Sequence, residues 1–149
     1  MPTKKTIAIL GTETIGKTIA AALCTSHRIL LFERDFQKAK ALEEEIKQHC
    51  AEADVEAMDC AHEASWEADV IIPAVPQEEE AAICERIQDV VTRKIVINIH
   101  SAEHQNQLQQ SLPHARVVHA AHENHSETAR IIKELVSADF DSASSLQFN

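Results

Sequence analysis

The chain has 149 residues, a formal net charge of −10, and a composition of 44% hydrophobic and only 3% aromatic residues. A chain of this length makes about one domain, and its negative charge argues against nucleic acid or an anionic membrane surface as a partner, because both select basic surfaces. With so few aromatic residues, Ile, Val, Leu and Ala must fill the core, which suits helices packed on a parallel sheet.

The N-terminal segment is predicted to form a strand, a tight turn and a helix. The apolar strand from Thr6 to Leu10 runs into Gly11, and Gly16 follows five positions later. Small and apolar residues then recur at helical spacing to about Ser26. Such a turn presents free backbone N–H groups and the positive end of a helix dipole, which together make a phosphate site.

The rest of the chain alternates apolar runs with amphipathic segments. We expect further strands over 28–33, 55–58, 69–76, 94–99 and 115–119. Helices are expected over 37–50, 61–68, 76–92, 102–112 and 126–136, with the acidic runs 43–45 and 78–80 on solvated helix surface. This alternation predicts one doubly wound, parallel α/β domain of Rossmann type over 1–149, with 137–149 as an edge strand or a frayed tail.

Two nucleotide-binding motifs fit the first turn. The dinucleotide fingerprint Gly-x-Gly-x-x-Gly places Gly11 first and Gly16 third, with Glu13 at the position of the second glycine. The phosphate loop Gly-x-x-x-x-Gly-Lys-Ser/Thr is matched by the same two glycines together with Lys17 and Thr18. The first motif predicts dinucleotide binding, and the second predicts magnesium-dependent binding and hydrolysis of ATP or GTP.

The surrounding sequence favours the dinucleotide motif. An acid that binds the adenosine ribose is expected about 20 residues beyond the first glycine, and Glu33 meets this expectation. Arg34 follows it and could bind the 2′-phosphate of NADP. A phosphate-loop NTPase should also offer an Asp at a strand end for magnesium, but Asp69 stands at the beginning of its strand and not at its end. NADP(H) is therefore the expected ligand, with NAD as the alternative because Glu33 and Arg34 favour different cofactors.

Four segments resemble the deazaflavin-dependent NADP reductase family. They read Ile-Ala-Ile-Leu-Gly-Thr-x-x-Ile-Gly-Lys from position 7, Glu-Arg-Asp-Phe-Gln-Lys-Ala-Lys-Ala-Leu from 33, Ala-Asp-Val-Ile-Ile-Pro-Ala-Val-Pro from 68 and Lys-Ile-Val-Ile-Asn-Ile from 94. The resemblance continues through 107–120 and, more loosely, 127–140. It implies a small NADP(H)-binding oxidoreductase that acts on a deazaflavin, a flavin or another small molecule. We also consider a homodimer.

The resemblance implies cofactor contacts as well. The loop after Gly11 would cradle the pyrophosphate, Glu33 and Arg34 would face the adenosine ribose, and the end of the fourth strand would flank the nicotinamide ribose. His100 directly follows the fifth strand and is the candidate for contact with the nicotinamide or the substrate. No catalytic residue is assigned, since the cofactor carries the chemistry and the protein positions it. The expected cofactor-binding residues are Gly11, Thr12, Glu13, Thr14, Ile15, Gly16, Glu33, Arg34, Ala74, Val75, Pro76 and His100.

Three departures from the family pattern suggest a second interpretation. Glu13 adds a carboxylate beside two phosphates, which at ~4–5 Å in a partly solvated site would cost on the order of 1–4 kcal/mol unless it turns away. Lys17 could offset part of this cost. Ser101-Ala102 replaces an Asn-Pro pair, and the segment 121–125, where such proteins build their substrate site, is short. The chain would then be a catalytically silent relative or a cofactor-free interaction module.

Histidines and cysteines supply the remaining candidates. The spacing of His119, His122 and His125 could hold zinc only if their loop folds back, and we expect these side chains to line the sheet edge instead. The four cysteines form no Cys-x-x-Cys pair and are typical of reduced thiols in a cytosolic protein. Only four apolar residues precede Gly11, so no signal peptide or membrane span is expected. We therefore predict a cytoplasmic location and no metal site.

Overall fold

The computed structural model describes residues 4–121 and 123–137. Its centre is a parallel sheet with the strand order β3-β2-β1-β4-β5-β6. The strands are β1 (Thr6–Leu10), β2 (Arg28–Phe32), β3 (Val55–Met58), β4 (Val70–Pro73), β5 (Ile95–Asn98) and β6 (Arg116–His119). The order reverses direction between β1 and β4, and open α/β sheets bind ligands outside the carboxyl ends of the strands at such a point.

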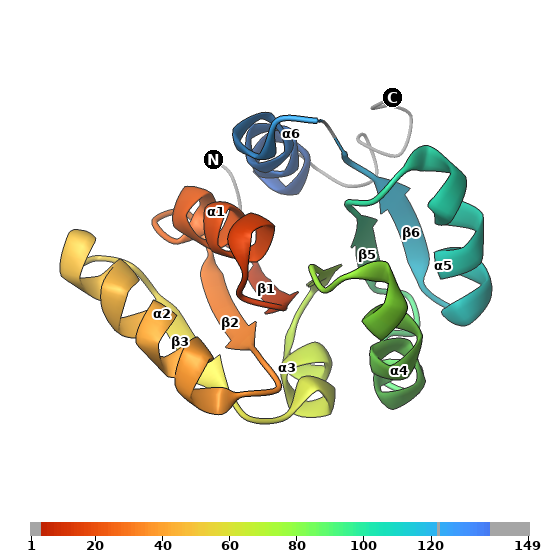
Figure 1. Ribbon diagram of the computed structural model, residues 1–149, viewed down its shortest axis with the longest axis horizontal. Coiled ribbons are helices and arrows are strands. Elements are labelled where there is room, and N and C mark those ends of the chain that lie inside the picture. Colours follow the sequence, from red (N-terminus) through yellow and green to blue (C-terminus); the bar gives the residue numbers. More distant parts are fainter. Residues whose placement is uncertain (1–3, 122, 138–149) are drawn as a thin grey trace.

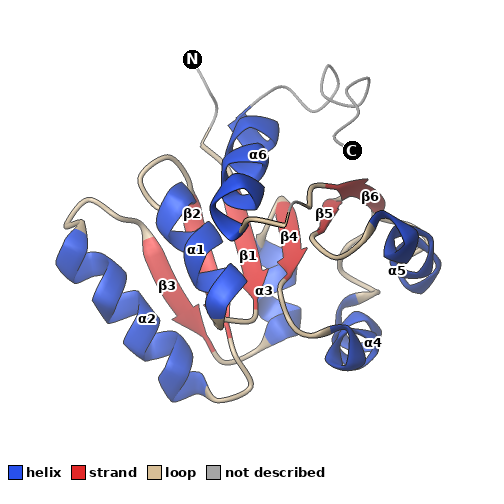
Figure 2. Cartoon of the chain, turned by 45° about the horizontal axis from the view of Figure 1, so that its top comes forward, coloured by secondary structure: helices blue, strands red, loops and turns tan. Residues whose placement is uncertain are grey.

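Helices cover both faces of this sheet (Figure 1). One face carries α1 (Thr14–Leu23), α2 (Phe36–His49) and α6 (His125–Ser137). The opposite face carries α3 (Ala61–Glu67), α4 (Gln77–Ile87), a 3-10 turn (Ala102–His104) and α5 (Gln105–Ser111). Figure 2 shows the sheet between these two helical layers. The predicted doubly wound α/β fold of Rossmann type is confirmed.

Alternate residues of β1 enter two separate hydrophobic cores. Ile7 and Ile9 pack with α1, α2 and α6, whereas Ala8 and Leu10 pack with α3, α4 and α5. All four side chains are fully buried. Successive side chains of a strand point to opposite faces, so a strand covered on both faces is apolar throughout its length. For this reason the run Ile-Ala-Ile-Leu was a reliable strand signal.

Two helices differ from the sequence prediction. The helix after β4 ends at Ile87 instead of continuing to about Thr92. Arg93 adopts a left-handed conformation with φ 67°, and its amide donates to the His114 carbonyl, so the chain turns back toward the sheet here. The segment 102–112 begins as a 3-10 turn and continues as α5. The edge strand or frayed tail expected after Ser137 lies outside the described residues.

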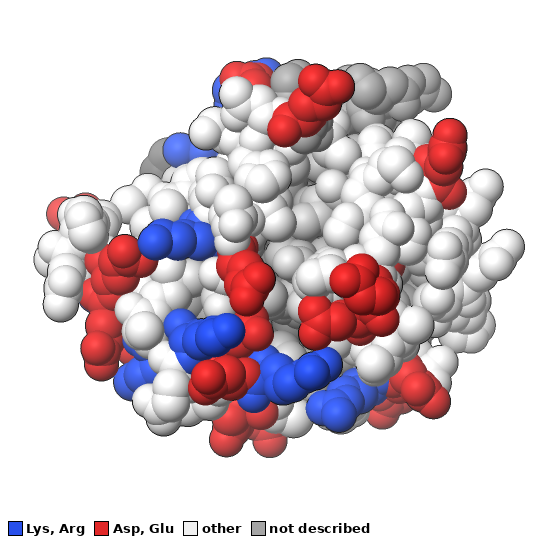
Figure 3. Space-filling view, viewed as in Figure 1, with Lys and Arg blue, Asp and Glu red and all other residues white. Residues whose placement is uncertain are grey.

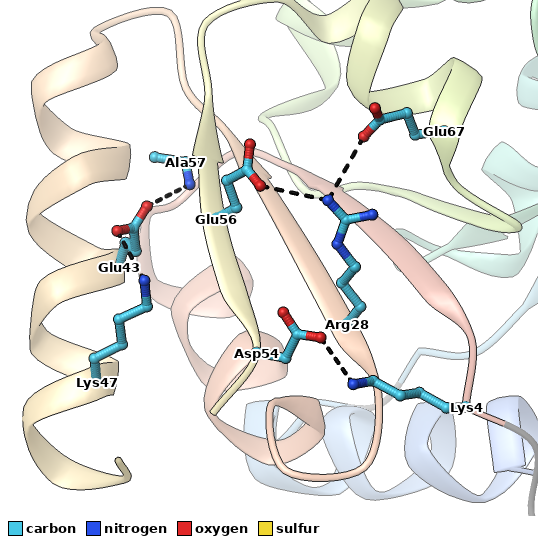
Figure 4. Close-up of polar contacts among 8 residues, drawn as sticks. All are labelled: Lys4, Arg28, Glu43, Lys47, Asp54, Glu56, Ala57 and Glu67. Carbon is cyan, nitrogen blue, oxygen red and sulfur yellow. Dashed lines mark hydrogen bonds and ion pairs between the residues drawn. The ribbon is translucent and has the colours of Figure 1, made fainter. Parts of the chain in front are cut away.

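Glu43 corrects the prediction of a solvated acidic surface on α2. The residue is only 6% exposed. Its carboxylate accepts a hydrogen bond from the backbone amide of Ala57 at 2.7 Å and from Lys40 and Lys47 at 3.2 Å each. Figure 4 shows the Ala57 and Lys47 contacts beside β3. Glu43 is buried because it belongs to the helix stripe that packs on the sheet, together with Ala39, Leu42 and Ile46.

Trp66 on α3 is the large apolar side chain that the described part of the chain leaves exposed, at 66%. Its carbonyl oxygen and that of Ser65 accept hydrogen bonds from Lys94 Nζ at 2.6 and 2.7 Å, so this lysine satisfies the C-terminal end of α3. None of the helices in the described residues is both long enough and apolar enough to cross a membrane.

Candidate functional site

The turn between β1 and α1 requires glycine at two positions. Gly11 has φ +122°, and a Cβ atom on it would lie 2.7 Å from the Ala74 carbonyl oxygen. A Cβ atom on Gly16 would lie 2.0 Å from the Gly11 carbonyl oxygen. Neither approach leaves room for a side chain. The first glycine therefore allows the tight turn and the last allows close packing of helix and strand, which are their functions in the dinucleotide fingerprint.

Glu13, at the middle position of the fingerprint, does not fill the turn. Its backbone is extended, with φ −83° and ψ 168°, a conformation that any residue adopts. Its side chain is 75% exposed, and the carboxylate lies 3.7 Å from Lys38 Nζ on α2. The acid that departs from the family pattern therefore lies at the rim of the turn and beside a cation.

The described residues give no support to the phosphate-loop alternative. The helix begins at Thr14, so the residues 14–16, which a phosphate loop would keep in its loop, are already helical. Lys17 Nζ forms an ion pair with Glu45 of α2 at 3.1 Å, and the Thr18 hydroxyl donates to the Thr14 carbonyl at 2.9 Å. The neighbouring strand β4 ends at Pro73 and offers no Asp for magnesium.

A pocket of about 470 Å³, the first pocket, lies where the strand order reverses. It is bounded by the β1–α1 turn, by the end of β2 with the start of α2, and by the end of β4 with α4. The predicted cofactor residues that line it are Gly11, Glu13, Glu33, Arg34, Ala74, Val75 and Pro76. The predicted residues that do not line it are Thr12, Thr14, Ile15, Gly16 and His100.

Glu33, which follows β2, is hydrogen-bonded to the glycine turn. Its Oε2 atom accepts hydrogen bonds from the Thr12 amide at 3.0 Å and from the Thr12 hydroxyl at 3.2 Å. The Gly11 amide donates to the Phe32 carbonyl at 2.8 Å. The acid expected at the ribose therefore lies beside the loop expected at the pyrophosphate.

Basic and acidic side chains alternate between α2 and α4 in an otherwise acidic protein (Figure 3). Arg34 Nη2 lies 3.2 Å from Glu79 Oε1, which links the end of β2 to the first turn of α4. The Arg34 side chain is 82% exposed, so this pair is solvated and weak. Lys38 and Arg86 also line the first pocket, and sequence reasoning assigned neither of them.

His100 lies behind the pocket wall in a network of polar side chains. Its Nε2 atom donates to the Val75 carbonyl at 3.1 Å and lies 3.3 Å from Glu80 Oε2. The other oxygen of Glu80 is 2.6 Å from His104 Nε2. Asn98, the last residue of β5, accepts a hydrogen bond from the His100 amide at 3.0 Å. These contacts tie the end of β5 to the start of α4.

Glu80 was expected on solvated helix surface, but it is 4% exposed. Burial opposes its ionisation, but the contacts with the imidazoles of His100 and His104 together outweigh burial and lower the carboxyl pKa. The contact with Glu80 in turn raises the pKa of His100. The buried stripe Glu80, Cys84 and Ile87 has helical spacing, a signal that could have identified this acid. Burial and Glu80 also raise the pKa of the Cys84 thiol to about 12, which leaves it unreactive.

The other predicted candidates do not assemble into a site. No three His, Cys, Asp or Glu side chains in residues 4–121 and 123–137 could hold a metal ion together. His122, one member of the zinc alternative, lies outside these residues. The cysteines Cys24, Cys50, Cys60 and Cys84 are free thiols.

The strand order and the glycine turn define this chain as a Rossmann-type domain with a turn of the dinucleotide-binding kind. Residues 6–102 match the family model described as NADP oxidoreductase, coenzyme F420-dependent. The chain therefore belongs to the coenzyme F420-dependent NADP oxidoreductase family, as the resemblance of its sequence implied. No curated protein matches it.

Solved structures share the fold at low sequence identity. A protein of Arthrobacter sp. FB24 assigned as an F420-dependent NADP reductase has a TM-score of 0.61 and 21% identity over 77% of this chain. Pyrroline-5-carboxylate reductase of Coxiella burnetii has a TM-score of 0.65 and 19% identity over 78%. The imine reductase of Myxococcus stipitatus in complex with NADP+ has a TM-score of 0.63 and 13% identity over 80%. The matches span 61%, 43% and 41% of these proteins, respectively.

Proposed function

We propose that this chain binds NADP(H) in the first pocket and provides the nicotinamide-nucleotide site of a deazaflavin-dependent oxidoreductase. The observation that carries the proposal is the turn from Gly11 to Gly16, which admits only glycine at both ends and lies where the strand order reverses. A bound nicotinamide nucleotide supplies the hydride chemistry. The residues of the chain bind and orient it.

The residues present fit such a ligand. The loop 12–16 would cradle the pyrophosphate at the N-terminal end of α1, where the helix dipole favours negative charge. Glu33 would face the adenosine ribose, and Val75 and Pro76 would flank the nicotinamide ribose. Glu13 is compatible with this arrangement because its carboxylate is paired at the rim. His100 donates to Val75 and would hold this wall of the pocket in place.

The cations that line the pocket are the groups that would favour NADP(H) over NAD(H). Arg34, Lys38 and Arg86 all line it, and a 2′-phosphate needs cations that a plain ribose does not. Glu33 Oε2 is already engaged by the Thr12 amide and hydroxyl, which reduces its capacity to accept from ribose hydroxyls. NADP(H) is therefore the cofactor that we propose.

Calorimetric titration of the purified chain with NADPH, NADH and magnesium-ATP tests this function. We expect saturable binding of NADPH, weaker binding of NADH and no binding of magnesium-ATP. Lys17→Ala should leave NADPH binding unchanged, because Lys17 is paired with Glu45 outside the pocket. Absence of binding by all three nucleotides, in a chain that circular dichroism shows to be folded, would overturn the proposal and leave the interaction module.

Hydride transfer needs a separate measurement. We expect hydride transfer from bound NADPH to an added deazaflavin, which leaves NADP+ and reduced deazaflavin. The loss of NADPH absorbance measures this reaction. NADPH binding without turnover, with deazaflavin and with flavin alike, would assign the chain as a catalytically silent relative. Recovery of NADPH binding only in Glu13→Gly would indicate that Glu13, at the position of the second glycine, prevents binding.

A further inference from the structure

A second pocket of about 360 Å³ adjoins the first. It lies at the carboxyl ends of β2 and β3 and at the start of α3. Phe32, Arg34 and Arg86 line both pockets, so the two meet at these three side chains. Glu33, the residue expected at the adenosine ribose, lies between Phe32 and Arg34 in the sequence. The junction is therefore within reach of a group attached to that ribose.

The second pocket is basic within an acidic protein. Arg34, Arg86 and His62 line it with one carboxylate, Asp59, although the whole chain has a net charge of −10. His62 is engaged by Asp89 at 3.0 Å, which leaves the two arginines as the cations of this pocket. The first pocket is not basic, because the acids in its lining outnumber the cations. The cations are Arg34, Lys38 and Arg86, and the acids are Glu13, Glu33, Asp35 and Glu79. An anion is accommodated better at the junction than in the middle of the first pocket.

Arg86 is distinct among the cations of the two pockets. Arg34 is paired with Glu79 at 3.2 Å, and Lys38 with Glu13 at 3.7 Å. The side chain of Arg86 has neither an ion pair nor a hydrogen bond with any residue that the structure describes. It is exposed in the last turn of α4. Its guanidinium therefore keeps five N–H donors available for a ligand.

We propose that Arg86 is a specificity-determining residue that binds the 2′-phosphate of NADP(H) opposite Arg34, at the junction of the two pockets. This assignment rests on the proposed function and extends it to a residue of α4. A guanidinium binds phosphate oxygens through two parallel hydrogen bonds. Arg34 and Arg86 come from different elements, so together they would hold the phosphate from two directions. NADH lacks this phosphate and would gain nothing from Arg86.

Two adenosine nucleotides that differ only in the 2′-phosphate test the assignment. Calorimetry should show that Arg86→Gln weakens binding of adenosine 2′,5′-bisphosphate by about tenfold or more, as expected for loss of a charge-assisted contact. Binding of adenosine 5′-monophosphate should change by less than about twofold. Arg86→Lys keeps the charge without the fork and should give an intermediate loss of bisphosphate binding. Unchanged bisphosphate binding in Arg86→Gln, or equal losses for both nucleotides, would overturn the assignment.

Arg130→Gln is the matched control. Arg130 is an exposed arginine of α6, on the opposite helical layer, and pairs with Glu127 and Glu134. This variant should bind both nucleotides as the unmodified chain does, and circular dichroism should show every variant folded.

Titration of the unmodified chain with NADPH and NADH separates the two proposals. A preference for NADPH that survives in Arg86→Gln would overturn only the assignment of Arg86. Failure to bind either dinucleotide would overturn the proposed function, and bisphosphate binding that still depends on Arg86 would then support the arginine site alone.

Discussion

The carboxylate of Glu43 accepts a hydrogen bond of 2.7 Å from the backbone amide of Ala57, at the β3 edge of the sheet (Figure 4). Ala57 belongs to β3, which is an edge strand, and every second amide of an edge strand points away from its one neighbour. The Glu43 side chain of α2 thus accepts a hydrogen bond from a backbone amide that has no partner strand. This contact protects one point of an edge that could otherwise pair with another chain.

Glu43→Ala should lower the free energy of unfolding by about 1–3 kcal/mol, because the Ala57 amide loses its acceptor and Lys40 and Lys47 lose their shared partner. Urea denaturation followed by circular dichroism measures the change. Glu44→Ala removes the neighbouring exposed acid and should stay within about 0.5 kcal/mol of the unmodified chain. Equal effects of the two substitutions would contradict the structural importance of this contact.

Gly11→Ala should abolish NADPH binding and destabilise the fold by about 1–3 kcal/mol. The new Cβ atom would stand 2.7 Å from the Ala74 carbonyl oxygen at φ +122°, so the turn must deform. Calorimetry and thermal unfolding measure the two effects. Ala21→Gly, at an exposed position of α1, should cost about 1 kcal/mol of stability without loss of binding. Retained binding in Gly11→Ala would show that the ligand does not use this turn.

Glu79→Gln should strengthen NADPH binding by roughly two- to fivefold and leave NADH binding unchanged. Glu79 lies 3.2 Å from Arg34 and competes with any phosphate for its guanidinium. The small size of the effect follows from the exposure of Arg34. Glu78→Gln, on the exposed side of the same helix turn, controls for the general change in charge. An equal gain in affinity for NADH would indicate a nonspecific electrostatic effect.

The stability contributed by His100 and Glu80 should depend on pH. The pKa of His100 is raised above its ordinary value of 6.5, so its contribution is complete below that pH and is lost as the pH rises through the folded-state pKa. The pKa of Glu80 is lowered from 4.5, so its contribution is present above that pH and is lost as the pH falls through the folded-state pKa. The pair should therefore stabilise the fold most between roughly pH 4.5 and 6.5.

Urea denaturation of the unmodified chain and of His100→Gln at pH 5.5 and 8.5 tests this window. The difference in unfolding free energy between the two proteins should shrink at the higher pH. Comparing this difference removes the effect of His27, whose pKa is lowered by burial and nearby lysines and whose contribution changes in the opposite direction. A difference that is constant with pH would show that His100 stabilises the fold only as a neutral side chain.

The fold could be predicted from the sequence because its strongest signals are local. Gly11 and Gly16 flank a turn that only glycine permits, and the apolar strand before them is buried on both faces, so spacing and composition sufficed. Glu33 was proposed from its distance to the first glycine and Arg34 because it follows Glu33, and both line the first pocket. Each of these signals can be identified without knowing what packs against it.

The buried acids and the second pocket required the structure. Glu43 and Glu80 stand in acidic runs, and only the packing of α2 and α4 decides which carboxylate of each run is buried. Their partners Ala57 and His104 lie 14 and 24 residues away. Arg86 reaches the junction of the pockets from the last turn of α4, a relationship that no motif records. The helical stripe at 80, 84 and 87 was the one sequence signal that could have identified Glu80.

Trp66 gives the molecule a spectroscopic property. It is the one tryptophan of a chain that contains no tyrosine, and its indole lies on α3, whose first residues line the second pocket. Because the indole is already in water, unfolding should shift its emission little. Any quenching of that emission when a nicotinamide nucleotide is added would then report energy transfer from a single known position. The chain thus carries its own optical probe for occupancy of the two pockets.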